Sequence, residues 1–404
     1  MRCHTVLSFP DFINDISRDG AKKCIVPGKW LLQSLLVWPD NESRYITALN
    51  WILFANLMLL ELFHASYVVV YRTEYGNAIT AAATVTTTFE CLVRYYIIVF
   101  KKPVINEILV SIWKKFWPLS VVSARKTNRL KNKCYITLAL TFGCYGPALV
   151  CNTIFTLTPY LTDSGLVFKS VFPFSWNQTY VYEALYFWQY VTAWYILILV
   201  NSFDFFMIPL VMICAVQFAL VRNAFKNILN AKSERQRQIL YGEAISDREM
   251  FLKCLDQQRM LIGICKQLEE VFRVAILFQF FCSTAALCTS IIILQVDETK
   301  FILMLTFAIA HMFQLFYYCY VGNELTVESD KMADAVYASD WYLSHDIKFK
   351  KELIFVLQRC QKPQTLTAAG FIDLNFLSYI SVLRVCFSFY TLLTKLIVTN
   401  NSKP

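Results

Sequence analysis

Residues 184–212 read ALYFWQYVTAWYILILVNSFDFFMIPLVM, and they indicate the class of fold. It is apolar almost throughout, and Asp204 is its one charged side chain. An α-helix rises about 1.5 Å per residue, so a run of about 20 apolar residues crosses the ~30 Å hydrocarbon core of a bilayer. The stretch therefore predicts a membrane-spanning helix. The segment that follows it, 213–270, carries nine lysines and arginines.

Comparable apolar runs recur along the chain, of which 57% is apolar and 17% charged. This composition is typical of a helical protein that crosses the membrane several times. Seven spans are expected, at 46–71, 78–99, 134–158, 184–212, 271–294, 301–321 and 371–398. Before the first of them, residues 30–39 are apolar but too short to cross, and we expect them to pack at the inner membrane interface.

The stretches between the spans alternate in charge. From the N-terminal segment to the C-terminal tail their totals of lysine and arginine are 6, 1, 9, 1, 9, 1, 6 and 1. Basic residues are retained in the cytoplasm during insertion. The alternation therefore predicts a cytosolic N-terminus and, after seven crossings, an extracellular C-terminus.

The basic stretches contain apolar residues at intervals, which indicates ordered helices. We expect spans four and five to continue as helices into 213–270, and a partly buried helix over 330–359. The expected organisation is a cytosolic segment (1–45), spans one to four (46–212), cytosolic helical extensions (213–270), spans five and six (271–321), a cytosolic anchor segment (322–370), span seven (371–398) and an extracellular tail (399–404). So much cytosolic helix suggests a platform that holds subunits together.

Composition argues against several classes of function. The net charge of +9 lies in the stretches assigned to the cytosol, where it meets anionic inner-leaflet lipid, and no nucleic acid is expected as a partner. Residues 1–28 lack the apolar core of a cleavable signal. No cysteine falls in an expected outer loop, so no extracellular disulfide framework is expected. No metal cluster, nucleotide-binding loop or catalytic triad is apparent, and we expect neither a cofactor nor an enzyme.

From residue 316 onward the sequence contains motifs that are characteristic of one protein family. The strings FYYCYVGNELTVESDKMADAVYASDWY (316–342), LQRCQKP (357–363) and FSFYTLLTKL (387–396) resemble the C-terminal signature of insect odorant receptors. The resemblance also extends to Leu35, Trp38 and Pro39, with Leu36 where the family usually has glycine. Its C-terminal part rests on these residues: Tyr318, Cys319, Gly322, Ser329, Ala335, Tyr337, Trp341, Arg359, Gln361, Lys362 and Pro363.

The resemblance implies an odorant-gated, weakly selective cation channel of four subunits, in which a tuning subunit assembles with a shared co-receptor. The co-receptor carries a large insertion between spans four and five, which this chain lacks, so it resembles a tuning subunit. The implied location is the plasma membrane of olfactory sensory neuron dendrites. The family's anchor and assembly positions correspond here to Tyr318, Cys319, Gly322, Ser329, Tyr337 and Trp341.

The last span carries its polar side chains on one face. Ser381, Arg384, Ser388, Thr391 and Lys395 follow at helical spacing, and Val382, Cys386, Phe389 and Leu393 lie opposite. A charge left in lipid costs about 2.5–3.5 kcal/mol or more, so the stripe is expected to face water or protein. Two interpretations remain, a water-filled pore or a helix buried against its neighbours, and the resemblance favours the pore with Leu392 as its hydrophobic gate. Arg384 and Lys395 suit a cation pore poorly; either they point sideways or partner subunits dominate conduction.

A pocket for a small volatile ligand needs aromatic walls and few polar groups. The resemblance places this pocket in the outer half, among spans two, three, four and six. It selects Val85, Phe89, Pro147, Cys151, Tyr186, Tyr190, Phe307 and His311. The alternative is that the aromatic residues are interfacial anchors and the small residues of span two allow close packing. On the expected outside, Asn177 begins an N-glycosylation sequon.

Other charges in the spans have structural interpretations. Glu90 and Arg94 are four residues apart and are expected to pair. Glu61 and His64 share a helix face and are expected to satisfy each other, and Asp204 is expected to make contacts near the cytosol.

Three other classes of membrane protein are alternatives to this interpretation. A G-protein-coupled receptor has the opposite topology, and an Asn-Pro-x-x-Tyr motif is missing, since Phe376 follows Asn375. A transporter is expected to show paired halves or broken helices. A gustatory-type receptor channel shares the fold and is the nearest alternative, although the Tyr-Cys…Gly and Gln-Lys-Pro strings argue against it.

Overall fold

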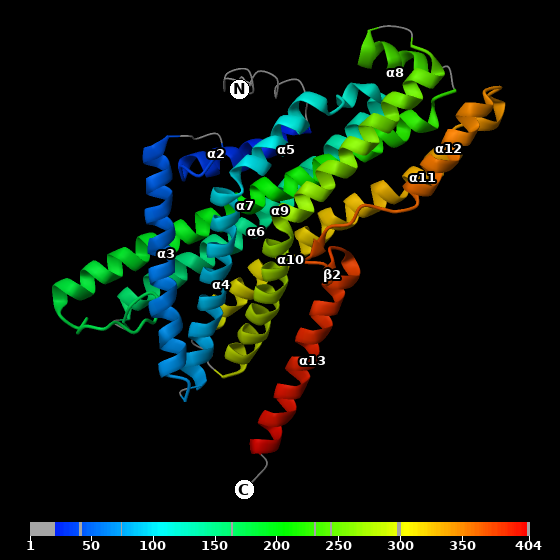
Figure 1. Ribbon diagram of the computed structural model, residues 1–404. Coiled ribbons are helices and arrows are strands. Elements are labelled where there is room, and N and C mark those ends of the chain that lie inside the picture. The colour runs from blue at the N-terminus through cyan, green and yellow to red at the C-terminus, as the bar shows by residue number, and fades with distance from the viewer. Residues whose placement is uncertain are drawn as a thin grey trace.

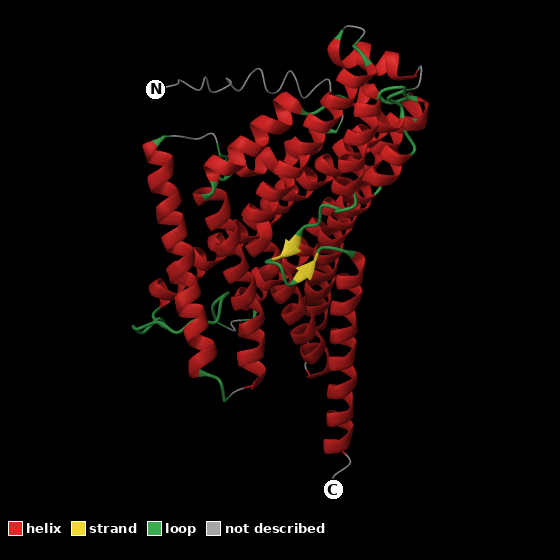
Figure 2. Ribbon diagram, turned by 45° about the vertical axis from the view of Figure 1, so that its right-hand side comes forward, coloured by secondary structure: helices red, strands yellow, loops and turns green. Residues whose placement is uncertain are grey.

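In the computed structural model the chain is a bundle of long helices, described over residues 21–39, 43–73, 75–162, 165–229, 232–242, 245–296 and 300–401 (Figures 1 and 2). The α-helices are α2 (Val26–Ser34), α3 (Arg44–Val70), α4 (Tyr75–Phe100), α5 (Lys102–Lys115), α6 (Ala124–Leu161), α7 (Thr179–Lys226), α8 (Lys232–Tyr241), α9 (Asp247–Val296), α10 (Phe301–Asp330), α11 (Met332–Tyr337), α12 (Ile347–Cys360) and α13 (Phe376–Asn401). Short 3-10 turns and one two-stranded hairpin join them.

The expected helical membrane fold is confirmed. Within the described residues six helices are long and apolar enough to cross a membrane, and α13 carries the seventh expected span. The start of α3 and the end of α13 lie at opposite ends of the bundle (Figure 1). This arrangement agrees with an odd number of crossings, whereas the side that faces the cytosol stays a prediction.

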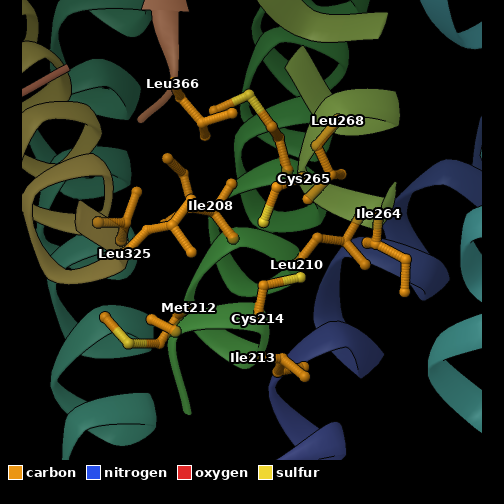
Figure 3. Packing of buried hydrophobic residues seen from close by; sticks show 14 of the residues in the cluster. Ile208, Leu210, Met212, Ile213, Cys214, Ile264, Cys265, Leu268, Leu325 and Leu366 are labelled. Atoms are coloured by element: carbon orange, nitrogen blue, oxygen red, sulfur yellow. The ribbon is translucent and has the colours of Figure 1, made fainter. Parts of the chain in front are cut away.

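Helix α7 is the core of the bundle. Its side chains are buried on every face from Asn201 to Val221, as expected for a helix that is apolar all round and enclosed by neighbours. It packs against α2, α6, α9 and α10. Figure 3 shows Leu210 and Cys214 of α7 among side chains of α9 and α10. By contrast α3 leaves most of its apolar surface exposed, which is the pattern of a helix that faces lipid.

The segment at 30–39 packs against α7, and its place at the inner membrane interface stays a prediction. The turn at Leu36 shows why glycine is usual at this position in the family. Helix α2 ends in a Schellman motif: the amide of Leu36 donates to Gln33 O (3.0 Å) and that of Val37 to Leu32 O (3.0 Å). Leu36 therefore adopts a left-handed conformation with φ of 58°. Glycine suits this position because it lacks the Cβ that makes the conformation unfavourable.

The expected single helix over 330–359 is wrong in detail, because the segment breaks twice. Helix α11 ends at Tyr337, a 3-10 turn spans Trp341–Leu343, and α12 starts at Ile347. Asp346 caps α12 by accepting from Lys348 N (2.8 Å) and Phe349 N (3.2 Å). These amides, with that of Phe349 first, and the guanidinium of Arg248 hold the pKa of Asp346 below its usual value.

Span seven also begins later than predicted, at Phe376 and not at 371. Strands β1 (Thr367–Ala368) and β2 (Ile372–Asp373) pair antiparallel, and Gly370 turns the chain between them with φ of 83°. The apolar residues there belong to this hairpin, so hydropathy alone assigned them to the helix. The hairpin lies directly before the start of α13 (Figure 2).

Candidate functional site

A cavity of about 280 Å³ lies between α3, α4, α6, α7 and α10. Most of its wall is apolar, and small side chains of α4 leave the room for it: Ala81, Ala83, Thr84, Thr87 and Thr88. The volume and the lining suit one small, largely apolar molecule.

The loop between α6 and α7 folds inward and roofs the cavity. Phe168 is held at both backbone groups by Gln189 of α7, whose Oε1 accepts from its amide (2.8 Å) and whose Nε2 donates to its carbonyl (3.1 Å). His64 of α3 lies 2.7 Å from Lys169 O, and because a carbonyl only accepts, Nδ1 of this histidine is the donor. The roof is thus tied to two helices by buried hydrogen bonds.

Three of the predicted ligand residues, Cys151, Phe307 and His311, line the cavity. Tyr186 instead donates its hydroxyl to the Thr156 carbonyl of α6, and the Tyr190 ring packs beside Trp194. The remaining three are also outside the wall: Val85, Pro147 and Phe89, whose ring packs on Phe278. Their roles toward a ligand stay predictions.

Sequence reasoning found Cys151 but missed its neighbours in the wall on α6. Cys144, Ala148, Asn152 and Phe155 follow at intervals that place them with Cys151 on one side of the helix. The signal was present as a stripe of small and polar residues at helical spacing. The roof residues gave no such signal, because a loop has no periodicity.

Beneath the cavity lies a buried ionic cluster, which we call the Arg94 cluster and define as Glu90, Arg94, Asp204, Gln314, Tyr317 and Tyr318. The expected pair is confirmed: Arg94 Nη2 lies 2.6 Å from Glu90 Oε1. Arg94 Nη1 also lies 3.1 Å from Asp204 Oδ1 and donates to Val200 O (3.0 Å). Gln314 and Tyr318 donate to Asp204 at 2.8 and 2.6 Å.

One expectation about charges gains detail and another is wrong. Asp204 is fully buried within the Arg94 cluster, where Tyr318, one of the predicted anchor positions, donates to it. Glu61 and His64 do not satisfy each other, since His64 bonds to Lys169 O and to Thr84 Oγ1 (2.7 Å), and Glu61 Oε2 has no hydrogen-bond partner among the described residues. The sequence shows that two side chains lie on the same face of a helix, but it does not show which residues of the neighbouring helices form hydrogen bonds with them.

The cluster reaches the cavity directly. Glu90 and Gln314 belong to both, and His311 of the wall lies 3.5 Å from Ser283 Oγ of α9. Ser283 in turn accepts from Gln279 (2.6 Å), which accepts from Arg94. The inner end of the cavity is therefore bonded to α4, α7, α9 and α10.

The signature residues of α10 join the Arg94 cluster to the linker before α13. Tyr318 belongs to the cluster, and Cys319 is fully buried beside it in the chain. At Gly322 the Leu374 carbonyl approaches so closely that a Cβ would meet its oxygen at 2.4 Å. Ser329 Oγ accepts from Gln364 N (2.9 Å). Two further signature residues, Tyr337, which is exposed, and Trp341, which is partly buried, lie beyond α10.

Helix α13 packs on α9 and α10 by one side only. Cys386 is buried there, with its Sγ 3.9 Å from Cys288 Sγ of α9. Ser381, Ser388, Thr391 and Leu392 are on the exposed side. The side chain of Lys395 lies outside the described residues. The structure thus separates the two faces that the sequence pattern distinguished, and conduction stays a prediction.

These features describe a multi-pass helical membrane protein with an internal cavity and a last helix that packs by one side. Comparison with known proteins identifies the family. The family model for the seven-transmembrane odorant receptor matches residues 74–387. The chain belongs to the odorant receptor family. The members of this family are receptors and not enzymes.

Individual relatives agree. Odorant receptor 2a of Drosophila melanogaster is 30% identical over 40% of each chain, and odorant receptor 85b of the same species is 21% identical over 85% of this chain and 89% of the relative. Matches to the first few of these relatives span about two fifths of their length. The solved structure of the olfactory receptor OR5 from Machilis hrabei in complex with eugenol has a TM-score of 0.79, at 15% identity, covering 95% of this chain and all of that one.

Proposed function

We propose that this chain is an odorant-receptor subunit that binds a small hydrophobic ligand in the cavity between α3, α4, α6, α7 and α10. The observation that carries the proposal is the mainly apolar cavity between the helices, covered in part by the loop that Gln189 holds. Eugenol, the ligand named with the similar receptor structure, is a molecule of the expected size and polarity. Cys151, Phe307 and His311 are the proposed contacts among the residues selected from the sequence.

In the proposed mechanism the subunit assembles with a co-receptor and opens a nonselective cation channel bordered by α13. The exposed polar face of Ser381, Ser388 and Thr391 supports this role. The hydroxyls of Ser381 and Thr391 donate to Leu377 O and Ser388 O of the same helix, and pore water would supply their remaining hydrogen bonds. Leu392, exposed beside the hydroxyls, is the proposed hydrophobic gate. A path for coupling is offered by the hydrogen bonds between the cavity wall and the Arg94 cluster, and by α10, whose Gly322 lies close against Leu374 of the linker.

Assembly is proposed to use the end of the bundle that carries α8, α11 and α12. There α12 exposes Ile347, Ile354 and Phe355, which in one subunit would face water. Exposed apolar clusters of this kind are typical of protein interfaces. This end is the proposed cytosolic anchor, and Asn177, exposed in the α6–α7 loop, is the proposed glycosylated site outside. The proposed location is the plasma membrane of olfactory sensory neurons.

The test is electrical recording from cells that express this chain with the co-receptor and are perfused with a panel of volatile compounds. We expect cation currents that persist when G-protein turnover is blocked. Phe307→Ala should change the ranking of ligands more than conductance, and Leu392→Ala should do the reverse. Cells with confirmed surface delivery that stay silent to the whole panel would contradict the proposal.

A further inference from the structure

One side chain in the cavity wall has an unmet hydrogen bond. Asn152 of α6 lines the cavity, and its Nδ2 is buried without a hydrogen-bond partner. Among the described residues no other wall side chain has a buried nitrogen or oxygen in this state. A buried donor without an acceptor costs about 1–3 kcal/mol, so the position needs an explanation.

The other polar groups of the wall provide the contrast. His64 is bonded to Lys169 O and Thr84, and Asn201 donates to Leu197 O (2.8 Å). Gln314 donates to Asp204 (2.8 Å), and Glu90 accepts from Arg94. Their hydrogen bonds are made within the protein. They shape the cavity but offer little to a ligand without breaking an existing bond.

Asn152 is also placed where a ligand would pass. It lies on the cavity side of α6, next to Cys151 and one turn from Phe155, whose ring packs against Phe168 of the roof at 5.3 Å. The aromatic rings form an apolar surface, and the Asn152 carboxamide is a polar group within that surface. The terminal torsion of asparagine is broad, so a rotation of this group can turn its N–H toward an occupant.

We infer that the ligand of this receptor carries one neutral oxygen that accepts a hydrogen bond from Asn152 Nδ2, as a carbonyl, ester, ether or hydroxyl oxygen does, and that Asn152 distinguishes such molecules from hydrocarbons of the same shape. The inference rests on the proposed function of the cavity. A neutral ligand is the expected one, since the carboxylate of Glu90 is already paired with Arg94 and most of the wall is apolar, although Lys169 and Lys300 also belong to it.

The experiment measures half-maximal concentrations for a matched series: a ketone, an alcohol, an ether and the alkane with the same number of heavy atoms. In cells with the co-receptor we expect the oxygenated compounds to be about 2- to 10-fold more potent than the alkane, the range of one net hydrogen bond. In Asn152→Leu, which keeps the side-chain shape, the ratio should fall to about one through loss of potency of the oxygenated compounds.

Thr153→Val is the matched control, because the Thr153 hydroxyl bonds to Leu149 O (2.8 Å) within the same helix and the residue lies outside the wall. It should leave the ratio unchanged. Equal potency of alkane and oxygenated compounds in the wild type would overturn the inference while leaving the proposed function in place, and so would a ratio that survives in Asn152→Leu. The wild-type receptor alone tests whether oxygenated compounds are preferred. The inference can therefore be refuted even if Asn152→Leu fails to reach the cell surface. Silence to every compound would overturn the proposed function and the inference with it.

Discussion

Arg94 of α4 and Asp204 of α7 form an ion pair of 3.1 Å with both side chains fully buried. Each charge has further partners: Glu90 for the arginine, and Gln314 and Tyr318 for the aspartate. Removing both charges from water is unfavourable, and only such dense pairing offsets the loss of hydration. The pair therefore fixes how α4, α7 and α10 meet beneath the cavity.

Arg94→Met should destabilise the fold strongly. The variant leaves Asp204 as a buried charge without its counter-ion, and breaking a buried pair in this way costs about 3–5 kcal/mol. We expect a lower melting temperature and less protein at the cell surface, measured by fluorescence-detected gel filtration and surface labelling. Arg125→Met, which removes an exposed arginine, is the control and should change neither. Normal stability of Arg94→Met would show that the cluster does not hold the helices together.

Gly322→Ala should separate ligand binding from channel opening. The added Cβ would meet Leu374 O at 2.4 Å and Leu374 Cβ at 2.5 Å, so the linker before α13 must move. Overpacking of this kind costs about 1–3 kcal/mol, which alters a two-state equilibrium about 5- to 150-fold. We expect odorant-evoked currents to shrink while the ligand still protects the protein against thermal unfolding.

Gly263→Ala supplies the control for this variant. Nothing lies within 4 Å of a Cβ placed there in α9, and alanine favours a helix over glycine by about 1 kcal/mol. It should keep full currents with equal or better stability. If Gly322→Ala conducted like the wild type, the contact with Leu374 would have no part in gating.

The spans were predictable because length and hydropathy fix them, whereas the cavity depends on which helix faces meet. Asp204 lies inside an apolar run, and nothing in the sequence near it indicates that Arg94 is its partner. The α6 stripe that contains Cys151 and Asn152 was readable in principle, but choosing it over the other side of the helix requires knowing where α7 and α10 lie. The hairpin at Gly370 was not predicted from the sequence, because its flanking residues are as apolar as the helix that follows.

Leu36→Gly should stabilise the protein. A left-handed conformation costs a residue with a Cβ about 1–2 kcal/mol, and glycine avoids this cost but loses about 0.5–1 kcal/mol through chain entropy. The net expectation is a gain of up to about 1.5 kcal/mol and a higher melting temperature. Leu35→Gly is the control, since Leu35 has an ordinary right-handed conformation, and it should destabilise. A loss of stability in Leu36→Gly would mean that the leucine side chain contributes more than its backbone strain removes.

Oxidation should hold the last helix against the bundle through Cys288 and Cys386. Their sulfurs are 3.9 Å apart across the contact between α9 and α13, and a disulfide requires about 2.05 Å, so a small adjustment of the side chains brings them to bonding distance. In the proposed mechanism α13 moves when the channel opens. We expect a membrane-permeant thiol oxidant to reduce odorant-evoked currents and a reducing agent to restore them.

Cys386→Ser should make the currents insensitive to the oxidant, and peptide mapping of the oxidised wild type should recover the bridged pair. Cys360→Ser is the comparison, because this buried thiol lies in α12, away from α13, and should leave the sensitivity unchanged. Full currents from receptors whose bridge is demonstrated by mapping would mean that α13 opens the channel without moving relative to α9 at this depth. The contact between Cys288 and Cys386 would then be a fixed pivot, and any motion of α13 would have to occur beyond it, toward Leu392.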